Sequence, residues 1–172
     1  MDLILVNEAD EPVGTMEKME VHQKALLHRA FSIFIFNSKN ELLLQQRALD
    51  KYHSAGLWSN TCCSHPSPGE DTAHAAAKRL KEEMGIETPL QHAFHFIYRA
   101  EFENQLTEHE LDHVFVGKFD GEPEPNPNEV SDISYQTVEQ LLSDMKENPQ
   151  NFTVWFKLIL PRLANEHKAS EI

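Results

Sequence analysis

The stretch Ala30-Phe31-Ser32-Ile33-Phe34-Ile35-Phe36 decides the fold class, because it is almost continuously apolar over the length of one strand. A run of this kind is typical of a strand that is buried on both faces of a sheet. Residues 37–40, Asn-Ser-Lys-Asn, have turn chemistry, and residues 41–47, Glu-Leu-Leu-Leu-Gln-Gln-Arg, return as a second strand. The sequence therefore predicts a sheet that is packed between other elements.

The clearest helix follows a long irregular segment over residues 48–70. Asp71 or Thr72 can cap this helix, and Gly85 can end it. Its expected apolar stripe consists of Ala73, Ala76, Leu80 and Met84. Because an irregular segment of that length is usually functional, residues 48–70 form a candidate site loop.

The remaining elements alternate between strands and helices. Strands are expected at residues 93–102, 111–119 and 133–136, and a proline-rich loop at 122–127. Helices are expected at residues 138–146 and 152–165, the second with a kink or break before Pro161. This order predicts an α+β sandwich with a mixed central sheet.

The composition is that of a soluble globular protein. A length of 172 residues suits a single domain over residues 1–172, and we take a monomer as the default. The net charge of −13 argues against nucleic-acid binding, which usually needs a basic face. The longest apolar run is too short to cross a bilayer, and the N-terminal residues carry no secretory leader. We therefore expect a cytoplasmic protein without a membrane partner.

The two cysteines, Cys62 and Cys63, are adjacent in the sequence. Neighbouring cysteines rarely form a disulfide without strain, so we expect free thiols in a reducing compartment. The placement of Cys63 in a long polar loop favours a functional thiol, and the alternative is a small apolar residue that fills the core.

Three short segments carry residues that could bind a metal. Asn60-Thr61-Cys62-Cys63-Ser64-His65-Pro66 places a thiol two positions before an imidazole. Glu108 and Glu110 would project from one face of an extended segment, and two like charges held close need a cation or a proton between them. Together with His22 and His28, these groups suit Zn²⁺, Mn²⁺ or a related divalent ion. The alternatives are an exposed acidic loop and surface histidines.

Basic side chains matter in so acidic a chain, because any anion site must be built from a few local cations. The candidates are Lys18, Arg47, Lys51 and Arg79. The alternative for each of them is a solvated surface charge.

These motifs together resemble type I isopentenyl diphosphate isomerase, a branch of the Nudix superfamily. The resemblance covers residues 3–157 and is carried by residues 27–32 (Leu-His-Arg-Ala-Phe-Ser), 58–66 and 108–110 (Glu-His-Glu). The helix that ends at Gly85 resembles a degenerate Nudix box, in which Glu82 and Glu83 match and Arg79 replaces a glutamate. The resemblance implies a Nudix-like α/β/α sandwich.

The resemblance also implies a role for each candidate residue. His22, His28, His65, Glu108 and Glu110 would hold a first divalent ion, which could be Mn²⁺, Zn²⁺ or Mg²⁺, and Cys63 is counted with this metal set as well. Glu83 would ligate a Mg²⁺ that bridges to the substrate diphosphate. The diphosphate would be bound by Lys18, Arg47, Lys51 and Arg79. The catalytic residues would be Cys63, Glu110, Tyr98 and Trp155.

The implied reaction converts isopentenyl diphosphate to dimethylallyl diphosphate, a small-molecule step that supplies isoprenoid biosynthesis. Moving a proton across an unactivated alkene passes through a carbocation-like state, which needs an acid, a base and an aromatic wall. We expect Glu110, aided by Tyr98 and the metal, to protonate the terminal methylene carbon. Cys63 would remove a proton from the carbon nearer the diphosphate, and Trp155 would stabilise the cation through its ring face.

Two other functions are possible from the sequence. A Nudix hydrolase of nucleoside diphosphate derivatives would need the helix carboxylate that Arg79 replaces. A metal- or nucleotide-binding module without catalysis would keep Cys63 and Glu110 as structural residues. The sequence assigns no role to seven histidines, most of which we expect at the surface: His53, His74, His92, His95, His109, His113 and His167.

Overall fold

The computed structural model describes the backbone of residues 1–170 and the side chains up to residue 166, so the side chain of His167 lies outside the described residues. The strands are β1 (Asp2–Val6), β2 (Pro12–Glu17), β3 (His28–Phe36), β4 (Glu41–Arg47), β5 (Trp58–Ser59), β6 (Cys62–Ser64), β7 (Gln91–Glu101), β8 (Thr107–Lys118) and β9 (Val130–Thr137). The helices are α1 (Lys18–Lys24), α2 (Thr72–Met84), α3 (Val138–Glu147) and α4 (Val154–Ser170), with single 3-10 turns at Glu103–Gln105 and Pro149–Asn151.

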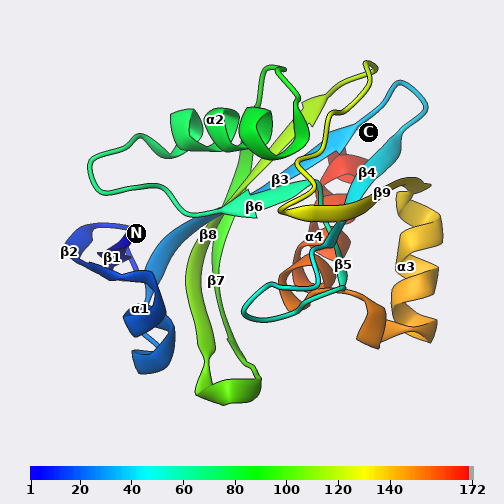
Figure 1. Cartoon of the computed structure of the whole chain (residues 1–172). Helices are drawn as coiled ribbons and strands as arrows, with labels where there is room; N and C mark the ends of the chain where they lie inside the picture. The colour runs from blue at the N-terminus through cyan, green and yellow to red at the C-terminus, as the bar shows by residue number, and fades with distance from the viewer. Residues whose placement is uncertain (171–172) are drawn as a thin grey trace.

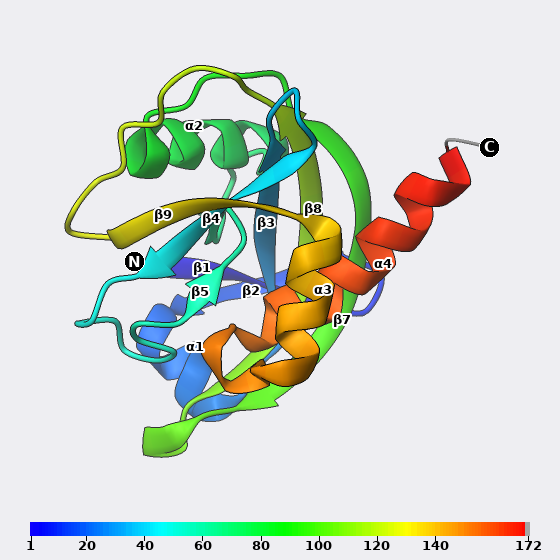
Figure 2. The ribbon, with the colours of Figure 1, turned by 90° about the vertical axis from the view of Figure 1, so that its right-hand side faces the viewer.

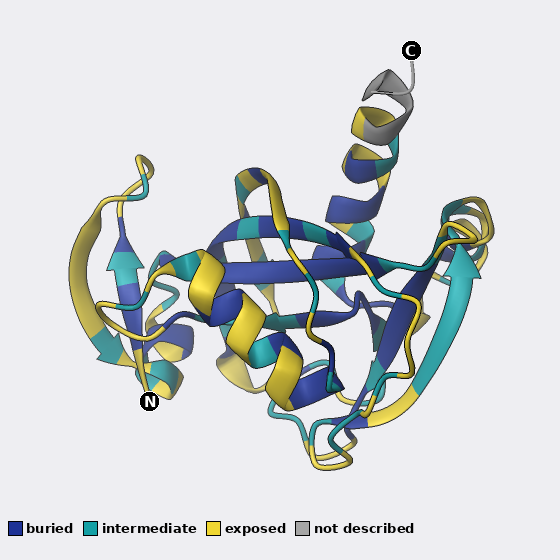
Figure 3. Cartoon of the chain, turned by 90° about the horizontal axis from the view of Figure 1, so that it is seen from above, coloured by how far each residue is buried: buried dark blue, intermediate teal, exposed yellow. Residues whose placement is uncertain are grey.

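One curled sheet separates two hydrophobic cores, as Figures 1 and 2 show. Helix α2 covers one face, and α3 and α4 cover the other. On β3, Phe31, Ile33 and Ile35 pack in the α2 core, whereas Phe34 packs in the α4 core. The strand is therefore buried on both faces, and the view from above in Figure 3 shows its buried length between the covering elements. The predicted α/β/α sandwich is confirmed.

The sheet is mixed because β3 runs parallel to β8, while the other pairings are antiparallel. The parallel register pairs His28 with Glu110 at one end and Phe36 with Lys118 at the other. On the other side of β8, the antiparallel register pairs Tyr98 with Glu110. Glu110 therefore lies between a histidine and a tyrosine that are far from it in the sequence.

Several elements differ from the sequence prediction. The prediction contained neither β1, β2 and α1 nor the short strands β5 and β6 inside the expected irregular segment. Strand β8 begins at Thr107 rather than at residue 111, so it already contains Glu108 and Glu110. The break expected before Pro161 is absent, because α4 runs through this exposed proline while Leu160 and Leu163 bury its core side.

Helix α2 has the predicted ends but a shifted apolar stripe. Asp71 accepts a hydrogen bond from the backbone N–H of His74 at 3.0 Å, and Gly85 takes the left-handed conformation at the C-terminus. Ala73 is exposed rather than buried, and Ala75 takes its place against the sheet. The buried face therefore includes Ala75 and Glu83, which lie two helical turns apart.

Among the described residues, no helix has both the length and the apolar character needed to cross a membrane.

We predict that Gly85→Ala destabilises the protein by about 2 kcal/mol or more. The backbone φ of Gly85 is +65°, and an added Cβ would lie 2.6 Å from the Cβ of Glu124 and 3.0 Å from its backbone. Gly69 is the matched control, because its φ is +79° but nothing lies within 4 Å of an added Cβ. Gly69→Ala should cost about 1 kcal/mol. Urea unfolding measures both, and equal losses would contradict the steric part of this explanation.

Candidate active site

A cleft with a cavity of about 70 Å³ opens between α1, the first residues of β8, the loop after β4 and α4. All four candidate cations line it, as do Cys63, His65, Glu83, Glu108, Glu110 and Trp155. His22, His28 and Tyr98 reach the same place through contacts with Glu108 and Glu110. The structure therefore brings together every residue that the sequence singled out for chemistry.

Three elements supply the imidazoles. His22 lies one turn after Lys18 on α1, His28 begins β3, and His65 follows β6 directly. The short helix α1 ends at Ala25, which takes the left-handed conformation and turns the chain back toward β3. The three rings lie close together, with centroid separations of 5.3 Å for His22 and His28 and 5.1 Å for His28 and His65.

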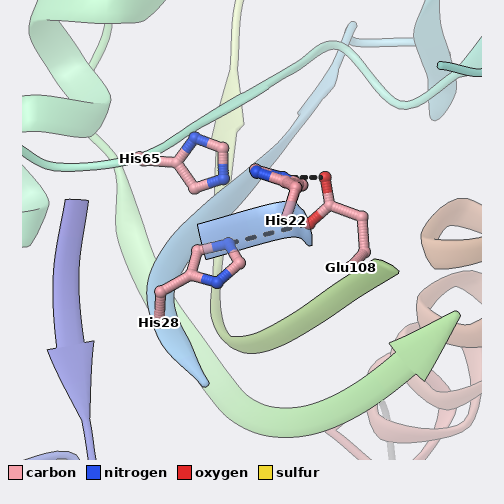
Figure 4. A group of neighbouring side chains, drawn as sticks. All are labelled: His22, His28, His65 and Glu108. Carbon is pink, nitrogen blue, oxygen red and sulfur yellow. Dashed lines mark hydrogen bonds and ion pairs between the residues drawn. The ribbon is translucent and has the colours of Figure 1, made fainter. Parts of the chain in front are cut away.

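The imidazoles and one carboxylate form a compact ligand set, shown in Figure 4. His22, His28, His65 and Glu108 each offer one ligand atom, and these atoms all lie within 4.8 Å of one another. Glu110 borders the set, because its Oε2 lies 2.8 Å from His65 Nε2 and 3.4 Å from His28 Nε2. Cys63, which the sequence also counted with the metal set, is not part of this cluster.

The hydrogen bonds of the outer ring nitrogens fix which nitrogens face inward. His22 Nδ1 lies 2.6 Å from the carbonyl oxygen of Lys18, and His28 Nδ1 lies 3.0 Å from that of Leu26. Each Nδ1–H donates to its carbonyl, so Nε2 is the ring nitrogen that faces the carboxylates, as a donor when it carries a proton and as a lone pair for a metal ion when it does not. Such outer contacts are characteristic of metal-binding histidines.

Two polar atoms of this set are buried without a hydrogen-bond partner among the described residues. They are Nε2 of His28 and Oε2 of Glu108, which lie 3.7 Å apart. Two lone pairs facing each other in a buried place repel, and a bound cation would satisfy both. The residues present therefore fit a divalent metal ion with nitrogen and oxygen ligands.

The two glutamates are buried yet charged. Burial opposes their ionisation, but hydrogen bonds from His22 and His53 hold the pKa of Glu108 well below its usual value. For Glu110, burial and the charge of Glu108 raise the pKa, and the neighbouring imidazoles of His28 and His65 outweigh them, so the pKa is lowered. Both side chains are therefore carboxylates at neutral pH, as metal ligands must be.

The adjacent cysteines lie on β6, which pairs with β3 in the sheet. They point to opposite faces, because successive side chains of a strand alternate. Cys62 is fully buried in the core under α2, and Cys63 is partly exposed and lines the cleft. Burial raises the pKa of the Cys63 thiol to about 12, although the charge of Arg47 opposes the shift. Cys63 is therefore a protonated thiol in this form of the protein.

Two aromatic side chains complete the inner wall. Tyr98 donates a short hydrogen bond from its hydroxyl to Oε1 of Glu110, and burial raises its pKa well above the usual value. The Trp155 indole N–H donates to Ser59 Oγ and Asn60 Oδ1, both at 3.1 Å, which fixes the orientation of the ring. The guanidinium of Arg47 lies 5.3 Å from the centre of the Trp155 ring.

Two of the four cations that line the cleft are held by acidic residues. Lys51 forms a short ion pair with Glu129, and Arg79 lies 3.3 Å from the same carboxylate. Arg79 also donates to Glu83 Oε2 at 2.8 Å, while Gln45 donates to Glu83 Oε1 at 2.7 Å. Lys51 and Arg79 are thus gathered around Glu129, which the sequence did not single out.

Sequence reasoning also missed a buried histidine. His53 was expected at the surface, but it is only 7% exposed and its Nε2 lies 2.8 Å from Oε1 of Glu108. Its ring stacks on Phe102 with the centroids 4.4 Å apart. Asp112 was missed as well: it is buried in line with Glu108 and Glu110, and burial raises its pKa well above the usual value. The alternation of β8 could have revealed Asp112, whereas no local pattern indicates His53.

The sequence and the fold of this chain are similar to those of known proteins. The NUDIX domain model matches residues 26–156. A Pectobacterium atrosepticum protein named isopentenyl-diphosphate Delta-isomerase is 51% identical over 98% of this chain and 94% of its own length. A Serratia proteamaculans protein of the same name is 53% identical over 95% of this chain and 92% of its own length. A crystal structure from Deinococcus radiodurans has the same fold, with a TM-score of 0.79 at 22% identity over 94% of this chain and 98% of the other.

We predict that Mn²⁺ stabilises the metal-free protein through the imidazole cluster. At a free Mn²⁺ concentration about 100 times Kd, Tm should rise by about 5–10 °C, because the ion binds only the folded chain. His28→Gln should lose most of this increase, since it removes one ligand. His74→Gln is the control, because His74 is exposed on α2, and it should respond like the wild type. An undiminished increase in His28→Gln, measured by calorimetry, would argue against the cluster as the ion's site.

We predict slow and steeply pH-dependent alkylation of Cys63 by iodoacetamide in the metal-free protein. Because the pKa of Cys63 is raised to about 12, the thiolate fraction grows with each unit of pH instead of reaching its maximum near neutrality. The rate should rise about tenfold per pH unit between about pH 7 and pH 10. Cys63→Ser should abolish the reaction and Cys62→Ser should retain it. A rate that levels off below about pH 9 would contradict the raised pKa.

Proposed function

The chain belongs to the isopentenyl-diphosphate Delta-isomerase family of NUDIX domains, and on this premise we propose that it converts isopentenyl diphosphate to dimethylallyl diphosphate. The observation that carries the proposal is one cleft that Cys63, Glu110 and Trp155 line together with four cations. The arrangement suits a small diphosphate whose hydrocarbon part reaches the inner wall. The substrate is a small molecule, and we infer a cytoplasmic, monomeric single-domain enzyme.

The diphosphate would bind at the mouth of the cleft. Lys18, Arg47, Lys51 and Arg79 can donate charge-assisted hydrogen bonds to its oxygens. Burial lowers the pKa of Lys18, so this ammonium gains more from an anionic partner than an exposed lysine would. The overall field of the chain is unfavourable to an anion, and these four local charges would outweigh it at short range.

In the proposed reaction, one of the two groups Glu110 and Cys63 is protonated while the other is ionised. In the forward direction, Glu110 gives a proton to the terminal methylene carbon and the Cys63 thiolate takes one from the carbon nearer the diphosphate. The reverse reaction begins from the opposite form, with Cys63 protonated and Glu110 ionised. The pKa directions of the two groups favour that second form in the free protein. Forward turnover would therefore require the proton to pass from Cys63 to Glu110 before each cycle.

Other residues would control this transfer. The Tyr98 hydroxyl donates to Glu110 and keeps one of its oxygens in place. The ring of Trp155 is held by Ser59 and Asn60 and would stabilise a developing cation, an effect of about 2 kcal/mol when water is excluded. The neighbouring thiol and carboxyl groups would act without competing water, which would otherwise quench the carbocation-like state.

Two metal ions fit the proposal. The imidazoles His22, His28 and His65 and the carboxylates Glu108 and Glu110 would hold the first, whose identity we leave as Mn²⁺, Zn²⁺ or Mg²⁺. Glu83 would ligate a Mg²⁺ that enters with the diphosphate, while Gln45 keeps its carboxylate oriented. The ions would supply charge neutralisation for the diphosphate and a fixed geometry for Glu110.

A nucleotide hydrolase is the second candidate, since the fold is shared with a protein named MutT NUDIX hydrolase from Burkholderia pseudomallei, with a TM-score of 0.62 at 18% identity. On α2, however, Arg79 faces the cleft and is paired with Glu83. A cation at this position removes a potential metal ligand and supports diphosphate binding instead.

Proton NMR of isopentenyl diphosphate in D₂O with Mg²⁺ and the metal-loaded protein tests the proposal. We expect dimethylallyl diphosphate with deuterium in a methyl group, because the proton added to the methylene carbon comes from a group in exchange with solvent. Cys63→Ala should lower turnover by at least about 100-fold and keep its metal content. Cys62→Ala is the matched control and should keep turnover within a few-fold.

The outcomes separate the candidates. An unchanged spectrum from metal-loaded wild-type protein would overturn the isomerase proposal. Phosphate release from a nucleoside diphosphate derivative would favour the hydrolase. Substantial turnover by Cys63→Ala would remove the proposed role of the thiol while leaving the isomerase itself in place.

A further inference from the structure

Three histidines without a role in the proposed reaction lie together on β7 and β8, the two strands at one side of the sheet. His95 and His113 are direct cross-strand neighbours. His92 lies three residues before His95, a spacing that would place the two on opposite faces of a regular strand. A register shift between His92 and Phe94 adds one residue to β7, so that His92 turns to the same face as His95.

The rings converge closely as a result. The centroid of His92 lies 5.1 Å from that of His113 and 6.4 Å from that of His95, and His95 and His113 are 5.3 Å apart. One ring nitrogen from each of the three lies within 4.8 Å of the other two. Two nitrogens on one tetrahedral Zn²⁺ are about 3.3 Å apart, so only a small rotation of the exposed rings of His92 and His95 is needed.

A carboxylate fixes the orientation of the central histidine. Asp10, in the turn between β1 and β2, accepts a hydrogen bond from Nε2–H of His113 at 2.9 Å. Arg29 holds Asp10 through its Nε at 2.7 Å from Oδ1, and it also donates to the Asp10 carbonyl oxygen at 2.7 Å. With its proton on Nε2, His113 turns an unprotonated Nδ1 toward His92, whose Nε2–H donates to it at 2.9 Å.

A carboxylate that accepts one ring N–H and leaves the other ring nitrogen unprotonated is the arrangement that orients histidines toward metal ions. An ion bound here would take the place of the proton between His92 and His113. A partly buried salt bridge between Arg29 and Asp10 gives the carboxylate a fixed position before any ion binds.

We propose that His92, His95 and His113 bind a second divalent transition-metal ion of the kind that imidazoles prefer, with Zn²⁺ as the probe. The site is distinct from the cleft, because none of its three ligands lines the cleft. They come from β7 and from the part of β8 that follows Glu110, and Asp10 supports the site from the β1–β2 turn. Three imidazoles leave one position of a tetrahedral ion open to water or another ligand. The ion would cross-link β7, whose only strand pairing among the described residues is with β8, to its neighbour.

Calorimetric titration of the zinc-loaded protein with Zn²⁺ tests the proposal, because the first equivalent occupies the cluster around Glu108 beforehand. The wild type should bind one further equivalent. His95→Gln should lose this second binding event, since it removes a ligand from an exposed position where folding is not at risk. His74→Gln, which changes an exposed histidine on α2, should bind the second equivalent like the wild type.

Asp10→Asn tests the supporting carboxylate. Asparagine tolerates the left-handed backbone at this position, where φ is 62°, but it lacks the charge. The second equivalent should bind at least about 10-fold more weakly in this variant. The visible spectrum of Co²⁺ in place of the second Zn²⁺ should show tetrahedral absorption in the wild type and in His74→Gln, but not in His95→Gln. A second event of unchanged affinity in His95→Gln would overturn the proposal, as would the lack of one in the wild type.

Discussion

The burial of Glu108 and Glu110 is the constraint on which the arrangement of the site depends. Two carboxylates two residues apart on one strand are costly in a place shielded from water, because each raises the free energy of ionising the other. The structure offsets this cost with imidazoles from three separate segments, each within about 4 Å of a carboxylate oxygen. The offset is incomplete, because His28 Nε2 and Glu108 Oε2 lack partners among the described residues. The carboxylates and the unpaired polar atoms of the cluster therefore suit a bound cation.

That cluster depends in turn on the register between β3 and β8. The parallel pairing sets His28 beside Glu110, and the apolar residues that follow on β3 fill the cores on both sides of the sheet. A slip of β3 by one residue would move Phe31, Ile33 and Ile35 to the wrong core and turn His28 to the face opposite Glu110. Packing of the apolar run thus fixes the position of the polar residue at its end.

The elements whose structure is specified by their own residues could be predicted from the sequence. The apolar run of β3 and the capped helix α2 follow from their own residues, and the resemblance supplied the ligand set. The first 27 residues could not be predicted, because α1 is a helix of seven residues that is held by its neighbours rather than by propensity. The same holds for His53, whose burial follows from the ring of Phe102 and the carboxylate of Glu108, both distant in the sequence. Ala73 was placed on the wrong side because alanine fits either face of a helix, and the neighbouring Ala75 fits the sheet.

The acidic residues around the cations make sense in a protein of net charge −13 that binds an anion. Lys51 and Arg79 would repel each other if they were held together without a counter-charge, and Glu129 lies between them. A diphosphate entering the cleft carries more negative charge than one carboxylate and can offer oxygens to both cations at once. Glu129 is therefore a weaker counter-charge than the diphosphate, and it holds the side chains of Lys51 and Arg79 together before the diphosphate binds. Binding then exchanges one set of ion pairs for a stronger set, and little side-chain entropy remains to be lost.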